Sequence, residues 1–402
     1  MARANVQPVL FEFVNYIIFD GEIIIWYLNI LMVKTDCAHF PLDRPCRFHK
    51  ESGVKCSSCG KYLPVGSRGK TKKLLIIKIG AMGDVLRTTF LLEGLKKKYD
   101  GAEITWIVAQ RAAPILEKNP LVSRVWYFDC GIFSKVAGES FDVCVNLDLA
   151  PESLGLATLA CASEKLGFWL DDKRRVVCSG PDAKKWLAMS AFDDLKKKNT
   201  ETYQRWMAQI AGLPESRYEI FTPLAASSLR KAADFKKKEG LAGRTVVGIN
   251  PGAGGRWRFK KWTDSGYSRL IERLNARGVK VLLLGGPEEK GLVDKLKKIS
   301  GGKAVSAGTD NSLLDFFALI NLCDLVVTGD TLALHAALGL KKKVVAVFGP
   351  TSPAEIELYG RGTKIITPAK CVCCYLQDCD VRPDCMKLIT PQRVIEAVEK
   401  WI

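Results

Sequence analysis

Two glycine-containing turns carry the residues with the clearest capacity for chemistry. The first turn, residues 79–84, follows an apolar run and presents a lone carboxylate, Asp84. The second turn, residues 249–255, also follows an apolar run and leads into four cations, Arg256, Arg258, Lys260 and Lys261. Exposed backbone N–H groups beside cations make a binding site for an anion. A carboxylate facing such a site is the arrangement expected of a transferase that uses an activated, anionic donor.

The spacing of the first turn leaves two interpretations of Asp84 open. Gly80 and Gly83 lack the full G-x-G-x-x-G spacing of a dinucleotide-binding turn, but they permit a tight turn and the close approach of another molecule. Asp84 is either the N-cap of the following helix or a general base. The second turn is interpreted as a phosphate-binding loop, with a glycine-rich loop that binds no ligand as the alternative.

Two further loops of the C-terminal half are candidates for nucleotide contacts. Glu288 and Glu289 follow a pair of glycines, so they either accept hydrogen bonds from ribose hydroxyls or stabilise the start of a helix. Residues 328–335 open another helix, whose first N–H groups and Thr331 hydroxyl suit a diphosphate. His335 lies on this apolar helix, where it either fills the core or orders the loop.

From residue 72 onward, apolar runs alternate with amphipathic stretches, which predicts parallel sheets with crossover helices. In the first series we expect a helix at 85–99, mostly helical structure over 151–240, and strands at 74–79, 103–108, 123–128 and 141–147. In the second series we expect strands at 245–250, 279–284, 324–328 and 343–348, with helices at 263–277, 288–298, 312–321, 331–339 and 391–401. The predicted fold is α/β, with two facing, doubly wound domains and the site in the crevice between them.

The charge of the chain indicates anionic partners. The formal net charge is +17, and lysine triplets recur at 96–98, 196–198, 236–238 and 341–343. A single triplet is usually a solvated helix end or strand start. Together they favour nucleotide phosphates, a phosphorylated acceptor, an anionic membrane surface or nucleic acid as partners.

The 14 cysteines fall mainly in two groups, which favours metal binding or local structure over a secreted disulfide framework. In the first group Cys56-x-x-Cys59 has a standard zinc spacing, and His39 and His49 are interleaved. We expect a structural zinc site there, with an iron–sulfur cluster or isolated thiols as alternatives; its ligands would be Cys37, Cys46, Cys56 and Cys59. The second group, residues 371–385, is a structural loop, a disulfide pair or a second metal site.

The first 35 residues are an apolar N-terminal extension. Acidic and polar residues interrupt it at positions 12, 20–22 and 29, so neither half has the ~18 clean residues that a membrane span needs. A basic region followed by a single apolar stretch and a cleavage site is also missing, which argues against a signal peptide. Met32 reads as a natural start. We therefore expect residues 1–31 to be an upstream extension, with an interfacial anchor as the second interpretation.

Taken together, these segments resemble glycosyltransferase family 9, the ADP-heptose:lipopolysaccharide heptosyltransferases. The resemblance covers residues 72–402, in order, and is specific as a set. The matching segments are LLIIKIGAMGDVLRTT (74–89), GINPGA (248–253), KKW (260–262), LLGGPEE (283–289), GDT (329–331) with His335, and VFGPTS (347–352). The cysteines of residues 371–385 are similar to a loop that many members carry near the carboxyl end.

The resemblance implies a GT-B fold and an inverting transfer that needs no metal or other cofactor. Asp84 matches the proposed general base, and Lys260 or Lys261 matches the lysine that stabilises the departing diphosphate. Leu332 stands where many members carry glycine, which bears on the identity of the donor. The donor-binding residues implied are Gly252, Ala253, Glu289 (as a ribose contact), Asp330, Thr331, Leu332 and His335. The acceptor-side loop would contain Gly80, Met82, Gly83 and Arg87.

We therefore predict a cytoplasmic enzyme at the inner face of the cytoplasmic membrane. It would move a sugar, heptose from ADP-heptose, to a lipid-linked anionic acceptor of the lipopolysaccharide core. The predicted parts are an extension (1–35), a cysteine-rich metal segment (36–68), an acceptor-binding domain (70–240) and a nucleotide-sugar-binding domain (241–402). Alternatives are a GT-B enzyme with another nucleotide sugar, a degenerate transferase that only binds, and a basic zinc-containing protein that binds nucleic acid. The last lacks a concentrated basic patch or a recognised binding motif, so we expect no nucleic acid partner.

Overall fold

The computed structural model describes residues 17–19, 22–24, 33–41, 43–64, 71–214, 218–254, 259–377 and 379–402. The chain divides into two compact units, Met1–Lys70 and Thr71–Ile402. The expectations for residues 1–31 fall almost entirely outside the described residues. Within that stretch the structure describes two short antiparallel strands, β1 (Ile17–Phe19) and β2 (Glu22–Ile24).

The cysteine-rich part of the first unit is a small loop closed on itself. Cys37 and Pro64 form an antiparallel bridge, and the Ala38 amide donates to the Leu63 carbonyl at 2.7 Å. Between these ends lie helix α1 (Arg47–Ser52) and a 3-10 turn over Cys56–Ser58. Helix α1 ends at Gly53, whose φ of 69° is the left-handed conformation that glycine tolerates best.

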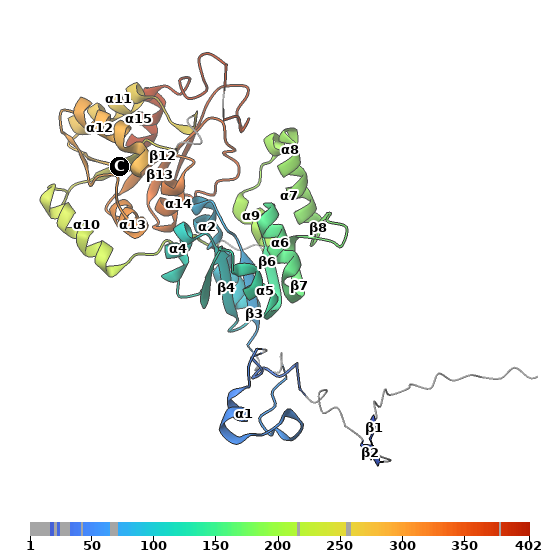
Figure 1. Cartoon of the computed structure of the whole chain (residues 1–402). Helices are drawn as coiled ribbons and strands as arrows, with labels where there is room; N and C mark the ends of the chain where they lie inside the picture. Colours follow the sequence, from blue (N-terminus) through green and yellow to red (C-terminus); the bar gives the residue numbers. More distant parts are fainter. Residues whose placement is uncertain are drawn as a thin grey trace, which may run out of the picture. The chain divides into compact units, whose positions relative to one another are not determined.

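The N-terminal half of the second unit, from β3 to α9, is built on a six-stranded sheet in the order β5-β4-β3-β6-β7-β8 (Figure 1). All neighbours pair in parallel except β7 and β8. The central strand is fully buried from Leu74 to Ile77, as expected for a sheet covered on both faces. The strands are β3 (Lys73–Ile77), β4 (Glu103–Val108), β5 (Arg124–Tyr127), β6 (Ser140–Asn146), β7 (Cys161–Leu170) and β8 (Val176–Cys178). The helices are α2 (Met82–Thr88), α3 (Leu91–Lys98), α4 (Ala113–Glu117), α5 (Ile132–Ala137), α6 (Pro151–Leu159), α7 (Pro181–Ala191), α8 (Asp193–Lys198) and α9 (Tyr203–Ile210).

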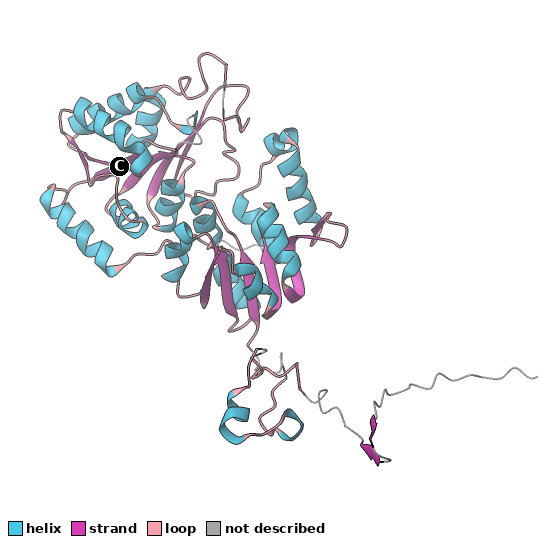
Figure 2. Ribbon diagram, viewed as in Figure 1, coloured by secondary structure: helices cyan, strands magenta, loops and turns pink. Residues whose placement is uncertain are grey.

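The C-terminal half, from α10 to α15, contains a second six-stranded sheet, which is parallel throughout. Its order is β11-β10-β9-β12-β13-β14, so in both sheets the first strand of the half lies in the middle. Helices pack around each sheet (Figure 2). The strands are β9 (Val246–Asn250), β10 (Lys280–Leu283), β11 (Ala304–Ser306), β12 (Leu325–Gly329), β13 (Lys343–Phe348) and β14 (Gly362–Ile366). The helices are α10 (Ala226–Lys238), α11 (Asp264–Ala276), α12 (Lys290–Ile299), α13 (Leu313–Asn321), α14 (Leu332–Gly339) and α15 (Pro391–Glu399).

The local structure differs from the sequence expectations at several places. The helix expected at 85–99 is two helices, α2 and α3, because the chain turns at Thr89–Phe90. The stretch 151–240 contains the helices α6 to α10, as expected, but it also contains two strands that were not expected: β7 extends the first sheet and β8 pairs with it. Strand β14 was not expected. The sequence carries no clear signal for this strand, because it is only five residues long and most of its side chains are half-buried, so apolar and polar positions do not alternate.

The two halves of the second unit share contacts. Helices α2 and α14 pack against each other, and one buried apolar cluster includes Leu86 of α2 and Leu334 of α14. Helix α10 precedes the boundary predicted at residue 240, yet it packs on α13, with Lys231 Nζ 2.9 Å from Asp315 Oδ2. That boundary stays a prediction. None of the helices in the described ranges combines the length and hydropathy that crossing a membrane requires.

Candidate active site

In the first sheet the strand order reverses between the neighbouring strands β3 and β6. Polar residues gather just after the carboxyl ends of these two strands. Lys78 follows β3 and forms a buried ion pair with Asp148, which follows β6. The amide of Ile79 donates to the other oxygen of the Asp148 carboxylate at 3.4 Å. Such a switch point is the usual ligand position in open α/β sheets. The pair therefore fixes the turn that carries the predicted acceptor-side loop.

Asp84 lies in the first turn of α2, with Arg87 one helical turn away. Arg87 Nη2 is 2.9 Å from Asp84 Oδ1, and the Arg87 guanidinium stacks 3.7 Å from the centre of the Tyr203 ring. Burial alone would raise the pKa of Asp84, but the charges of Arg87 and Lys78 outweigh it and lower that pKa. About a third of the Asp84 side chain remains exposed. The carboxylate is therefore ionised at neutral pH and open to an incoming group.

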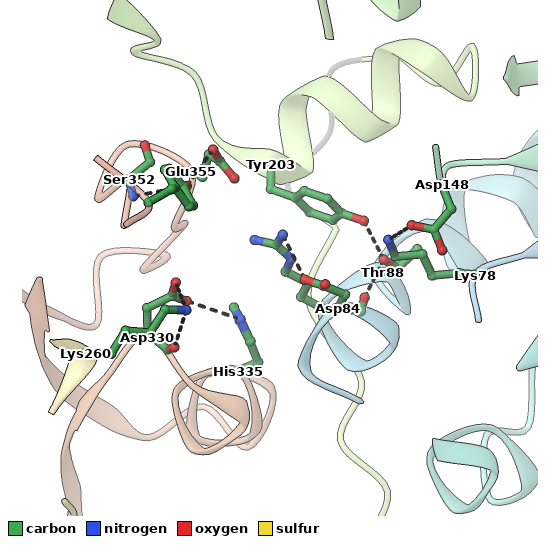
Figure 3. A network of polar contacts seen from close by, with 12 residues as sticks. Lys78, Asp84, Thr88, Asp148, Tyr203, Lys260, Asp330, His335, Ser352 and Glu355 are labelled. Atoms are coloured by element: carbon green, nitrogen blue, oxygen red, sulfur yellow. Dashed lines mark hydrogen bonds and ion pairs between the residues drawn. The ribbon is translucent and has the colours of Figure 1, made fainter. Parts of the chain in front are cut away.

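Asp330, at the end of β12, is the centre of a second charged group. Lys260 Nζ lies 3.0 Å from its Oδ2 and 3.3 Å from its carbonyl oxygen, and His335 Nε2 lies 3.9 Å from Oδ1. Burial opposes ionisation, but Lys260 and the other cationic groups nearby lower the pKa of Asp330 to about 2. Figure 3 shows this group facing Asp84 across the contact between the halves. The structure thus brings four residues named from the sequence, Asp84, Lys260, Asp330 and His335, into one region, and their roles stay predictions.

His335 is neutral at physiological pH. Burial, followed by the charge of Arg87, lowers the pKa of the imidazole to about 4. Among the described residues, its Nδ1 and the Nε of Arg87 are buried side-chain atoms without a hydrogen-bond partner. Buried polar atoms are rarely left unpaired in proteins. Both atoms therefore lie without a hydrogen-bond partner in the packed contact between α2 and α14.

The loops at the end of β9 and β12 are tied together by Asn250. Its Oδ1 accepts from the hydroxyls of Thr328 (3.1 Å) and Thr331 (3.2 Å), and its Nδ2 donates to the Leu284 carbonyl at 3.2 Å. A Cβ on Gly329 would lie 2.9 Å from the Lys260 carbonyl oxygen, so only glycine lets the lysine segment come this close. The network holds Thr331 and Lys260 at the carboxyl edge of the sheet.

Glu289 anchors the loops of the C-terminal half. Its Oε1 accepts from the Gly254 amide and its Oε2 from the Gly286 amide, both at 3.0 Å. The side chain is buried and lies directly over Gly252, where any Cβ would collide with it. Both oxygens are therefore engaged by backbone donors, and each keeps a further lone pair. The predicted ribose contact stays a prediction.

Leu332 and Met82 belong to the packing between the halves. Both side chains are partly buried against the apolar cluster shared by α2 and α14. The Leu332 Cα would lie 3.6 Å from a Cβ on Gly83, and His335 Cδ2 only 3.3 Å from it. Gly83 thus permits the close approach of the two helices that brings Asp84 toward the Asp330 group.

Sequence reasoning missed four residues that the fold adds to the site. Lys78 and Asp148 form the buried pair described above, and Tyr203 covers Arg87. The fourth is Glu355, whose pKa is raised chiefly by burial and whose carboxylate accepts from the Tyr375 hydroxyl at 3.2 Å. A lysine directly after an apolar strand was the available signal for Lys78. The others come from distant segments and carry no motif of their own.

Some predicted residues are not brought to this centre. Lys261 is half-buried beside Lys260, and of these two lysines it is Lys260 that pairs with Asp330 in the described part of the chain. Arg256 and Arg258 lie outside the described residues. Ala253 and Gly80 lie in the expected loops after β9 and β3.

The predicted metal ligands of the first unit share one cavity of about 270 Å³. It is lined by all four cysteines and both histidines, Cys37, His39, Cys46, His49, Cys56 and Cys59. His49 Nδ1 is 3.0 Å from the Val54 carbonyl oxygen, which leaves Nε2 as its other ring nitrogen. In the described part of the chain, no group of three or more His, Cys, Asp or Glu side chains is arranged to hold a metal ion as it stands.

Comparison of the sequence with known proteins identifies a family and several relatives of this chain. A family model described as glycosyltransferase family 9 (heptosyltransferase) matches residues 136–381. Lipopolysaccharide heptosyltransferase 3 of Escherichia coli is 26% identical over 289 residues, which are 67% of this chain and 81% of that protein.

Two solved structures share the fold. A family 9 glycosyltransferase of Veillonella parvula has a TM-score of 0.66 at 18% identity and covers 82% of this chain and 97% of its own. The Escherichia coli heptosyltransferase WaaC with ADP-2-deoxy-2-fluoro heptose has a TM-score of 0.55 at 17% identity, with coverage of 82% and 99%.

Proposed function

Because this chain belongs to glycosyltransferase family 9 (heptosyltransferase), we propose that it transfers a heptose from ADP-heptose to a lipopolysaccharide-core-type acceptor, with inversion at the anomeric carbon. The chain is a glycosyltransferase, and its predicted two-domain α/β fold is confirmed. Family membership also favours the enzyme over the nucleic-acid-binding alternative. The donor, the acceptor and the stereochemistry are the parts that need experiment.

One observation carries the proposal: an ionised, partly exposed Asp84 faces the Lys260–Asp330–His335 group. In the proposed reaction Asp84 takes the proton of an acceptor hydroxyl as that oxygen attacks the anomeric carbon. The bond from this carbon to the diphosphate breaks, and the leaving group departs on the opposite face. Direct attack by the acceptor inverts the anomeric centre. Arg87 keeps the carboxylate oriented through its contact with Oδ1.

Charge on the departing diphosphate is stabilised from the C-terminal half in this account. Lys260 supplies a cation, and the N-terminal end of α14 supplies backbone N–H groups. The unpaired Nδ1 of His335 and Nε of Arg87 offer further contacts to a bound donor. These cationic and dipolar groups are suited to the task that a divalent metal performs in other glycosyl transfers, so we propose that catalysis needs no metal or other cofactor.

Leu332 favours a second candidate, a transferase of the same fold that uses another nucleotide sugar. Glycine at this position would leave the start of α14 open to a pyrophosphate, whereas Leu332 places a side chain there. Its packing against the shared apolar cluster supports a role in helix contact. The nucleotide preference decides between the two candidates.

The nucleotide preference and the transfer are measured on the same preparation. Calorimetric titration with ADP, UDP and GDP, in the presence of a chelator, should show selective binding of ADP. Incubation with ADP-heptose and a core acceptor that lacks heptose should then add one heptose to the acceptor mass. Tight UDP or GDP binding would contradict the donor and support the second candidate. ADP binding without transfer of heptose would contradict the proposed lipopolysaccharide-core acceptor.

We further propose that the enzyme works at the inner face of the cytoplasmic membrane, as a peripheral protein. Phe192 and Leu195 are 59% and 38% exposed at the start of α8, and the lysine triplet 196–198 ends the same helix. Apolar side chains beside lysines are typical of contact with anionic lipid, with ~1 kcal/mol for each basic residue near the surface. Co-sedimentation with vesicles that contain anionic lipid should fall in Phe192→Asp, and binding that is unchanged would contradict this surface.

A structural Zn²⁺ held by Cys37, Cys46, Cys56 and Cys59 is the remaining proposal. The four thiols line one cavity, and the Cys56-x-x-Cys59 spacing fits one edge of a tetrahedral site. The cysteine-rich loop has no fully buried side chain in its helix or its 3-10 turn. A metal would therefore supply stability that an apolar core of this size lacks. Zinc analysis of the Cys56→Ser/Cys59→Ser variant tests it, with metal loss expected.

A further inference from the structure

Glu355 is a carboxylate whose contacts within the fold leave most of its hydrogen-bonding capacity open. It lies in the loop of residues 349–361, between β13 and β14, and its side chain is half-buried. Its Oε1 accepts from the Tyr375 hydroxyl at 3.2 Å, and within the described part of the chain no basic side chain forms an ion pair with it. An ionised carboxylate offers about four acceptor positions. Since polar groups withdrawn from water are normally hydrogen-bonded, the open positions indicate a ligand that donates to them.

The loop that carries Glu355 is fastened ahead of this residue. Ser352 is buried, and its amide donates to the Tyr375 hydroxyl at 3.2 Å. The Tyr375 amide in turn donates to the Pro350 carbonyl at 2.9 Å. Tyr375 therefore contacts both the backbone of the loop and the carboxylate of Glu355. Hydrogen bonds of this kind hold a binding residue in one orientation before its ligand arrives.

Tyr203 connects Glu355 with the predicted general base. The Tyr203 amide donates to the Glu355 carbonyl at 2.9 Å, and the guanidinium of Arg87 stacks 3.7 Å from the centre of the Tyr203 ring. Arg87 pairs with Asp84. In Figure 3 Glu355 and Asp330 come from the C-terminal half, and Asp84 comes from the N-terminal half. Glu355 therefore borders the same site as Asp84 and the Asp330 group.

The charges of the substrates limit what a carboxylate at this place can bind. In the proposed function the diphosphate of the donor and the acceptor are both anionic, and another negative charge would repel them. Sugar hydroxyls are neutral, and their hydrogen bonds to an ionised acceptor are roughly twice as strong as those between neutral groups. The anomeric carbon has to lie between Asp84 and the Asp330 group for the reaction to occur. The sugar ring that contains this carbon therefore lies in the part of the site that Glu355 borders.

We propose that Glu355 is a specificity-determining residue, which accepts hydrogen bonds from hydroxyl groups of the transferred sugar. The inference rests on the proposed function, because it assigns a role within the same site. Tyr375 orients the carboxylate, and the acceptor positions that Tyr375 leaves open receive the sugar hydroxyls. Glu355 thus selects the donor by its sugar, whereas Lys260 and the start of α14 bind the diphosphate whatever sugar it carries.

Glu355→Gln tests the proposal, because glutamine keeps the size of the side chain and an oxygen for the Tyr375 hydroxyl. Calorimetry without acceptor compares the binding of ADP and of ADP-heptose. The variant should bind ADP as the wild type does, and ADP-heptose about 10- to 100-fold more weakly, because hydrogen bonds to a charged group are lost. Glu357→Gln is the matched control, since Glu357 lies in the same loop and accepts from the Tyr359 amide at 2.7 Å. It should change neither affinity.

Donors that lack a single hydroxyl group identify the contact. The ADP-heptose analogue without the hydroxyl that Glu355 binds should have the same affinity for the wild type and for Glu355→Gln. Analogues that lack a different hydroxyl should keep the difference between the two proteins. Chemical denaturation separates binding from a structural role, and Glu355→Gln should unfold at the same denaturant concentration as the wild type.

The proposal is overturned if Glu355→Gln weakens the binding of ADP and ADP-heptose equally, leaves both unchanged, or raises only the KM for the acceptor. A wild-type chain that binds a UDP-sugar or a GDP-sugar instead would contradict the proposed donor alone. The same comparison, between that nucleotide and its sugar derivative, then decides the role of Glu355. A wild-type chain that binds no nucleotide sugar would contradict both the proposed function and this inference.

Discussion

Gly83 and His335 lie against each other where α2 meets α14. A Cβ on Gly83 would be 3.3 Å from His335 Cδ2, which is closer than an ordinary side-chain contact. The absence of a side chain on Gly83 therefore sets the separation of the two helices. Since Asp84 is the next residue and Asp330 begins the loop before α14, this contact also sets the distance between the two charged groups.

Gly83→Val is expected to force α2 and α14 apart. Overpacking of this kind costs about 1–3 kcal/mol, and the displaced Asp84 should lower kcat as well. The matched control is Gly155→Val in α6, where a Cβ would meet nothing within 4 Å. Chemical denaturation and transfer assays of both variants check the prediction. Equal losses in the two variants would mean that only helix propensity was affected.

Lys260 is expected to be the lysine that binds the diphosphate. Lys260→Met should weaken ADP binding by about 10- to 100-fold, because a charged hydrogen bond is lost, while Lys261→Met should change it little. The variant should also lose stability, since Asp330 would remain buried with its main cation removed.

The double variant Lys260→Met/Asp330→Asn separates the two effects. It removes both charges of the buried pair, so unfolding stability should recover while ADP binding stays weak. Calorimetry and denaturation on the same samples provide the readout. If Lys261→Met has the larger effect on ADP affinity, the assignment of the two lysines is reversed.

The neutral state of His335 predicts a specific loss of stability in acid. Its pKa in the folded chain is lowered to about 4 from 6.5, so the folded state binds fewer protons than the unfolded state between these values. Stability is therefore full above pH ~6.5 and falls as the pH decreases toward ~4, by about 2 kcal/mol between pH 7 and pH 5. His335→Gln should flatten this part of the profile.

The other two histidines of the chain provide controls for that measurement. His39 and His49 lie in the first unit, and replacing either by glutamine should leave the unfolding of the second unit unchanged over the same pH range. Chemical denaturation at pH 7 and pH 5 gives the comparison. Parallel profiles for wild type and His335→Gln would show that another group titrates.

The sequence was sufficient to predict the parts of the site that lie in strand-to-helix turns. Asp84, Lys260, Asp330 and His335 each sit in or next to such a turn, and the topology of parallel sheets gathers turns at one edge. Tyr203 and Glu355 could not be predicted in this way. They reach the site from α9 and from the loop after β13, and their roles depend on how the two halves pack.

The secondary structure could not be predicted from the sequence where the burial of side chains along an element is uneven. Strand β7 carries Glu164 and Lys165 and is exposed or half-buried over most of its length, so it lacks the continuous apolar run that marked the central strands. Its pairing with β6 and β8 supplies the stability that the pattern did not indicate. The hydrogen bonds of the Glu289 side chain could not be predicted from the sequence either, because the two amides that donate to it belong to separate loops.

The measurement that tests the account most directly is transfer by Asp84→Asn, with ADP affinity determined on the same sample. The account predicts that kcat falls by about 10²–10⁴ while ADP binding is nearly unchanged, because the general base is lost and the donor side is intact. Asp182→Asn is the control, since Asp182 also lies in the first turn of a helix and pairs with a cation one turn away. An Asp84→Asn variant that retains wild-type transfer would contradict the central claim.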